Sequence, residues 1–220
     1  MELTSEDLQQ MNRTMRHKLR NHCAGMEMSV TAIREELEDL DPSQLILCDL
    51  MLKELKTLES FTDRMNLVYG QLLPGEPENF YEILQEITTE LHGRFPQQEF
   101  TIQNEASFLA VKAGEYWRII LREMLTNACL HGQGDIDIHW QLGESFKFKV
   151  VNNCNDFDTK IPITPPKPFY TNKGRCDGLG LSIVDRLCKE MNGEFEFKLK
   201  SKDAKVHSFI ALPFEDNFDV

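Results

Sequence analysis

The sequence predicts an α+β protein in which an N-terminal helical hairpin is followed by an α/β sandwich, and three observations lead to this prediction. Before residue 70, apolar residues recur every three or four positions, which is the period of an amphipathic helix. Glycine and proline are rare in the same stretch, where Gly25 and Pro42 occur, and become frequent after it. Beyond residue 78, segments that alternate apolar and polar residues are mixed with helix-like segments, as in a sheet that is covered by helices.

Two helices are expected in the first part of the chain. One spans residues 4–40 and ends before Asp41-Pro42-Ser43, because proline interrupts a helix and Ser43 can cap the next one, which runs to residue 69. Two helices cannot cover each other's apolar stripes completely, whereas two hairpins paired in a four-helix bundle can do so. We therefore expect residues 1–70 to form a dimerisation hairpin and the protein to be a homodimer.

The remainder of the chain is predicted to form a linker, a second domain and a short tail. The linker is residues 71–77, since two prolines and a glycine there stop a helix. The domain covers residues 78–214, and the tail covers residues 215–220. Within the domain we expect helices at 79–92, 114–131 and 179–192, short strands at 100–102 and 108–111, hairpins of strands 135–142 with 145–151 and 194–200 with 205–212, and a long loop at 154–177.

Composition excludes several classes of function. The formal net charge of −12 argues against a nucleic-acid partner. The six cysteines are scattered singly without a C-x-x-C pair, so neither a zinc site nor a disulfide framework is expected, and reduced thiols in the cytoplasm are the simplest interpretation. No apolar run approaches the roughly 20 residues that a membrane span requires. We therefore expect any upstream sensor to lie on another chain.

The first candidate site surrounds His17 on the first predicted helix. Helical spacing places this histidine away from the apolar stripe, with Arg13, Arg20 and Asn21 on the same face. An exposed imidazole among arginines suits a group that accepts a phosphoryl and must neutralise its charge. A surface histidine on a charged helix would have the same pattern.

The second candidate site lies on the helix predicted at residues 114–131. Glu123, Asn127 and His131 are four residues apart and share one helical face. Mg²⁺ takes few protein ligands and keeps several waters, so a single carboxamide or carboxylate can be sufficient to hold it near a phosphate. The alternative is the polar face of an amphipathic helix.

The third candidate site is the junction between the long loop and the helix predicted at residues 179–192. Phe169 and Lys173 lie in the loop, and Gly178 and Gly180 lie where the loop enters the helix. Glycine permits a positive φ and a close approach of the backbone, and the N–H groups at a helix N-terminus bind phosphate. This combination favours a phosphate-binding site at the start of the helix.

Together and in this order, the three segments resemble the histidine-kinase family. The segment around His17 resembles its H box, and residues 123–131 resemble its N box. Pro168-Phe169 resembles the F box, and residues 178–182 resemble the second glycine box. The resemblance extends from about residue 10 to residue 214, and it implies that the second domain is a HATPase domain of the GHKL type.

The resemblance also implies a mechanism for two-component signalling. ATP and Mg²⁺ would bind to the second domain, the γ-phosphoryl would pass to His17, and the aspartate of a response-regulator receiver domain would then take it. Residues carried over by position are His17 as the phosphoacceptor, Asn21 beside it, Asn127 as the magnesium ligand, His131 near the phosphates, and Phe169, Lys173, Gly178 and Gly180 around the nucleotide.

The sequence departs from the family pattern at three places, one of which is Cys176, where the second glycine box usually has its first glycine. In the first glycine box, Asn152 stands where the family has an adenine-binding aspartate, and Cys154 and Asp156 stand where it has glycines. A neutral carboxamide can still accept a hydrogen bond from adenine, although charged hydrogen bonds are roughly twice as strong. The residue after the acceptor histidine, usually acidic, is Lys18, so we hypothesise that Glu123 supplies the base.

These departures leave two alternatives open. The protein could be an ATP-independent histidine phosphotransferase, a pseudokinase that relays phosphate between receiver domains through His17. It could also be a non-catalytic dimeric adaptor, in which case His17→Ala would leave its function unchanged.

Overall fold

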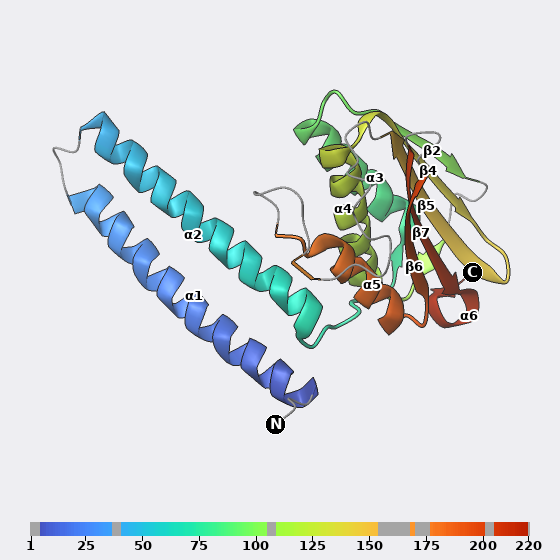
Figure 1. Cartoon of the computed structure of the whole chain (residues 1–220), viewed down its shortest axis with the longest axis horizontal. Helices are drawn as coiled ribbons and strands as arrows, with labels where there is room; N and C mark the ends of the chain where they lie inside the picture. Colours follow the sequence, from blue (N-terminus) through green and yellow to red (C-terminus); the bar gives the residue numbers. More distant parts are fainter. Residues whose placement is uncertain are drawn as a thin grey trace. The chain divides into compact units, whose positions relative to one another are not determined.

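The computed structural model describes residues 5–36, 41–104, 109–153, 168–169, 177–200 and 205–219. The chain divides into two compact units, Met1–Leu72 and Leu73–Val220, and the boundary falls within the predicted linker. The first unit is a helical hairpin and the second is a helix-covered sheet (Figure 1). The predicted α+β fold class is therefore confirmed. In the described part of the chain, no helix is both long and apolar enough to cross a membrane.

The hairpin consists of α1 (Ser5–Glu36) and α2 (Pro42–Tyr69). Ion pairs connect the two helices at two levels, from Arg20 to Asp63 and from Arg34 to Asp49, the latter at 2.7 Å. The pairs connect early residues of α1 to late residues of α2, so the two helices are antiparallel.

The start of α2 differs from the expected cap, because Asp41 rather than Ser43 is the N-cap residue. The Asp41 carboxylate accepts hydrogen bonds from the backbone N–H groups of Ser43 and Gln44 at 2.8 and 3.0 Å. The Gln44 side chain accepts the backbone N–H of Asp41 at 3.0 Å, which completes a capping box. Hydrogen bonds from the Ser43 hydroxyl and the Gln44 N–H hold the pKa of Asp41 below its ordinary value.

The second unit contains a five-stranded sheet in the order β2-β4-β5-β7-β6, with β2 parallel to β4 and the other neighbours antiparallel. The strands are β2 (Phe100–Asn104), β4 (Gln133–Gln141), β5 (Ser145–Asn153), β6 (Glu194–Lys200) and β7 (Lys205–Pro213). Three helices, α3 (Phe80–Arg94), α4 (Gly114–His131) and α5 (Gly180–Glu190), cover one face of the sheet (Figure 1). Buried and less buried residues alternate along β7, as expected for a sheet with one covered face.

An aromatic cluster forms the centre of this core. The fully buried ring of Phe80, the first residue of α3, makes edge-to-face contacts with Trp117 on α4 and with Trp140, Phe146 and Phe148 on the sheet. The ring centroids are 5.0 to 5.6 Å apart, within the range that favours aromatic pairs. The two helices and the sheet are thus packed around one side chain.

A small second sheet holds the end of the chain, in the order β1-β3-β8. Its strands are β1 (Glu78–Asn79), β3 (Ala110–Val111) and β8 (Phe218–Asp219), and β8 follows the short α6 (Phe214–Asn217). The prediction of a separate tail at residues 215–220 is therefore wrong. The Asn217 side chain is buried and donates hydrogen bonds to the carbonyls of Met191 and Pro213 at 3.0 and 2.9 Å, which anchors this segment to the domain.

Arg118 on α4 forms ion pairs with β1, at the start of the second unit, and with α3. Its guanidinium donates to both carboxylate oxygens of Glu78 on β1, with Nε at 3.0 and 3.1 Å, and to Glu86 on α3 at 2.7 Å. The hydrogen bond from Arg118 keeps the pKa of Glu78 below its ordinary value.

We predict that Phe80→Ala lowers the free energy of unfolding of the second unit by about 3 to 5 kcal/mol, because it removes a buried ring and leaves a cavity. Phe169→Ala, the same substitution at a side chain that is 50% exposed, is expected to cost less than about 1 kcal/mol. Urea unfolding of both variants measures the difference, and equal losses would contradict the central role of Phe80.

The ion pair between Arg118 and Glu78 predicts a dependence of stability on pH. Since the folded pKa of Glu78 lies below the ordinary 4.5, the pair stabilises the fold above that pH, and the stabilisation is lost as the pH falls through the lowered pKa. The loss of stability caused by Arg118→Gln should therefore be largest at pH 7 and shrink towards pH 3. A loss that stays constant over this range in denaturant titrations would rule the explanation out.

Candidate functional site

His17 lies exposed on α1, as its position in the helical pattern predicts. Asn21 is one turn further along, and its Nδ2 is 3.5 Å from Nε2 of His17. This distance is at the outer limit of a hydrogen bond, and the direction of the contact depends on the tautomer of the ring. Asn21 therefore lies beside the imidazole on the same face of α1.

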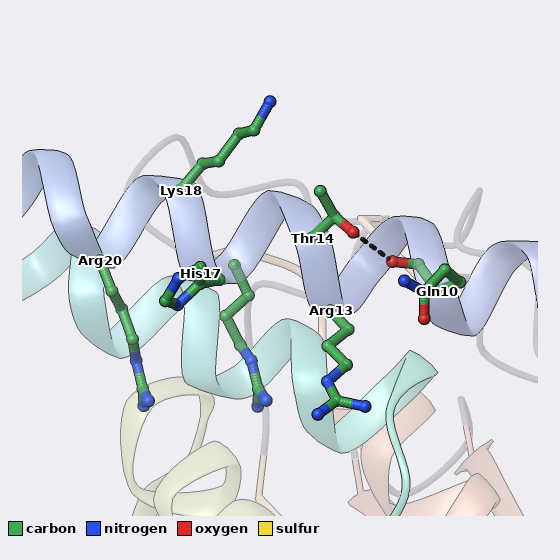
Figure 2. A pocket seen from close by; sticks show the side chains of 7 residues that line it. Gln10, Arg13, Thr14, His17, Lys18 and Arg20 are labelled. Atoms are coloured by element: carbon green, nitrogen blue, oxygen red, sulfur yellow. Dashed lines mark hydrogen bonds between the residues drawn. The ribbon is translucent and has the colours of Figure 1, made fainter.

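A surface pocket surrounds this imidazole. Its lining residues are Gln10, Arg13, Thr14, Arg16, His17, Lys18 and Arg20. In Figure 2, Arg13 and Arg20 extend from α1 in the same direction, and the ammonium of Lys18 extends away from them. Lys18 thus adds positive charge near His17 without occupying the face on which the two guanidinium groups lie.

The second candidate site is a stripe along α4. Its apolar face is buried against the core and includes Trp117, Leu121 and Met124. Glu123, Asn127 and His131 are each partly exposed, as expected for residues spaced by four along the edge of that buried face. The structure therefore brings these three side chains onto one accessible stripe.

The end of this stripe lies against Asn152 at the end of β5. Asn152 is 5% exposed, and its carboxamide donates to the Asn153 carbonyl at a long 3.4 Å. Gly132, which follows α4 directly, permits this approach, because a Cβ there would lie 2.9 Å from Nδ2 of Asn152 and 2.4 Å from the Ala128 carbonyl oxygen. Gly132 was not identified from the sequence, because the contact that its missing side chain permits is with Asn152 on a strand distant in the chain.

A third group of residues lies at the start of α5. Gly178 has a φ of 68°, which confirms the expected left-handed backbone, and its carbonyl accepts the N–H of Phe169 at 3.0 Å. The Asp177 carboxylate accepts the N–H of Leu179, also at 3.0 Å. Leu179 is the N-cap of α5 and its own side chain makes no cap hydrogen bond, so the carboxylate of Asp177 is the described side chain that lies at the positive end of this helix.

Two features of this junction were not anticipated from the sequence. Phe169 has a positive φ of 66°, which a non-glycine residue adopts rarely, and the role of Asp177 in holding the loop was not anticipated. Predicted residues Lys173, Cys154 and Asp156 lie outside the residues that the structure describes.

Comparisons with known proteins agree with this architecture. Residues 115–216 match the family of histidine kinase-, DNA gyrase B- and HSP90-like ATPases. No curated protein matches the sequence significantly.

Several solved structures of histidine kinases have a similar fold. The mycobacterial sensor histidine kinase MprB superposes with a TM-score of 0.55 at 15% identity, over 63% of this chain and 97% of that chain. Histidine kinase AdeS from Acinetobacter baumannii superposes with a TM-score of 0.61 at 15% identity, over 90% of this chain and 97% of that chain. Full-length ShkA in complex with AMPPNP has a TM-score of 0.76 at 17% identity, over 96% of this chain and 46% of that chain.

The family match and the sheet topology define the second unit as a GHKL-type ATPase-like domain. With the helical hairpin that precedes it, the chain has the fold of solved histidine kinases.

Proposed function

We propose that this protein is an ATP-dependent protein histidine kinase that phosphorylates His17 and then passes the phosphoryl group to a response-regulator aspartate. The observation that carries the proposal is the exposed imidazole of His17 on α1, in a pocket whose lining includes three arginines and Lys18. The chain that presents this imidazole also contains a domain of an ATPase family.

The residues of the second unit fit a nucleotide with its metal ion. Asn152 offers a buried carboxamide whose hydrogen bond to the Asn153 carbonyl is long, at 3.4 Å, which suits a base edge. Gly178 and Gly180 lie at the N-terminus of α5, which suits phosphate, and His131 lies near the end of α4. Asn127 would provide an oxygen ligand for Mg²⁺, an ion that keeps most of its waters. When bound, ATP and Mg²⁺ supply the phosphoryl group and neutralise its charge.

In the proposed transfer, the lone pair on Nε2 of His17 forms the bond to the γ-phosphorus. The bond from that phosphorus to the bridging oxygen breaks, and ADP leaves with the electron pair. Asn21 lies beside Nε2, with its Nδ2 3.5 Å away. Glu123, which is partly exposed on α4, would serve as the base that takes up the proton released from the ring, since Lys18 cannot accept one while charged.

The surface of the hairpin supports a homodimer. Several large apolar side chains of the single chain are strongly exposed on α1 and α2. These include Met26, Met28, Ile46, Leu47, Leu50 and Met51, each more than half exposed. Pairing with a second hairpin in a four-helix bundle would bury this surface, which a monomer would leave in water.

The charge around His17 supports a receiver domain as the partner. The phosphorylation pocket of a receiver domain is acidic, and the arginines beside His17 would steer its approach in a salt-dependent way. We also propose a cytoplasmic location. Cys23, Cys48, Cys129 and Cys188 are free thiols, which suits a reducing compartment.

Asn152 favours one further candidate function. The neutral carboxamide accepts a weaker hydrogen bond than the aspartate found in the family. If ATP does not bind, His17 would instead take its phosphoryl group from the aspartyl phosphate of one receiver domain and relay it to another.

We predict that the wild-type protein, incubated with γ-labelled ATP and Mg²⁺, acquires an acid-labile, base-stable label, and that His17→Gln abolishes it, because a carboxamide has no ring nitrogen to form the N–P bond. His22→Gln, at an exposed histidine of the same helix, is the control and should keep the label. Absence of label and of ATP binding by calorimetry in the wild type would favour the phosphotransferase.

We predict that Glu123→Gln lowers the rate of autophosphorylation by about 10² or more, since an amide cannot take up the proton. ATP affinity should stay within about threefold of wild type if the carboxylate acts as a base rather than as a ligand. Glu115→Gln, at an exposed glutamate in the first turn of the same helix, is the matched control. A normal rate in Glu123→Gln would remove Glu123 from the mechanism.

A further inference from the structure

Two guanidinium groups flank His17 on one side of α1. Arg13 precedes the histidine by four residues and Arg20 follows it by three, so they lie one turn before and one turn after it on the same helical face. Figure 2 shows both side chains extending in the same direction, with the His17 ring between them.

The pocket around His17 is positively charged and has no acidic side chain in its lining. Its lining contains four cationic side chains together with Gln10, Thr14 and the histidine itself. Arg20 is ion-paired with Asp63 on α2, whereas Arg13 has no ion pair among the residues that the structure describes. Within a chain of net charge −12, this pocket concentrates positive charge at one point.

Asp63 gives Arg20 a defined position. The contact joins one nitrogen of the guanidinium to one carboxylate oxygen, and a guanidinium has five N–H donors, so several remain for another acceptor. Because Asp63 belongs to the opposite helix, it restricts the long Arg20 side chain and orients the remaining donors. A planar fork of this kind matches the oxygens of a phosphate better than a flexible ammonium does.

We propose that Arg13 and Arg20 form an oxyanion site over His17 that binds a tetrahedral anion of the phosphate class, with Asp63 as a positioning residue for Arg20. The inference deepens the proposed function, on which its biological role rests, because the phosphoryl group carried by Nε2 would occupy the same place. The arginines would neutralise that group before, during and after the transfer.

Inorganic phosphate is the probe, added to the full chain without ATP and without metal. The ring signals of His17 are followed in spectra of protein labelled with ¹⁵N at histidine, and His17→Gln identifies them. We expect a saturable shift in the wild type, and a rise in the Kd for phosphate of at least about threefold in Arg13→Gln and in Arg20→Gln, given the small contribution of exposed ion pairs.

The control is Lys53→Gln, which removes the same charge from an exposed position of α2 outside the pocket. Phosphate affinity should be unchanged in this variant. A wild type without saturable shift, or an equal loss of affinity in Lys53→Gln and Arg13→Gln, would overturn the site, because phosphate would then respond only to the net charge.

This experiment separates the site from the kinase activity. Label from ATP on His17 together with phosphate binding that does not depend on the arginines would overturn the site and leave the proposed function in place. Arginine-dependent phosphate binding in a chain that takes no label from ATP would support the site and remove the proposed kinase activity.

Discussion

The packing of Phe80 and Trp117 against the inner face of the sheet is the contact on which the second unit depends. Trp117 is large and fully buried against Phe80, so the close-packed core accommodates it in one rotation of α4 about the helix axis. Once that rotation is set, Glu123, Asn127 and His131 can only lie on the accessible edge of the helix. The candidate nucleotide site is thus a consequence of core packing, rather than a separate feature added to the surface.

In the hairpin, the arrangement around His17 depends on the spacing of residues along α1 and on one ion pair with α2. The spacing of four residues from Arg13 to His17 and from His17 to Asn21 places all three on one face of α1. From the opposite helix, Asp63 forms an ion pair with Arg20. The chemistry proposed at His17 therefore needs the helix itself and one contact from α2.

The sequence predicts those parts of the structure that local periodicity determines. The helices and the two long strand hairpins have enough residues to display a period of 3.6 or of 2, and they are found where expected. Strand β8 has two residues, too few for any pattern, so the final segment was mistaken for a tail. Gly132 against Asn152, and Asp63 beside Arg20, depend on residues distant in the chain, so no local signal could reveal either contact.

Two of the departures from the family pattern, Lys18 and Asn152, have unequal weight once the structure is considered. Lys18 stands where the family has an acidic residue. Its side chain extends away from the face that carries Arg13 and Arg20, so its ammonium does not lie between the two guanidinium groups (Figure 2). Asn152 is 5% exposed, and a carboxylate there would be costly to bury unless paired. The carboxamide removes this cost from the nucleotide-free domain but also gives up a charged acceptor for the base. The same substitution therefore favours the nucleotide-free fold and, under the proposed function, would weaken the hydrogen bond to the base.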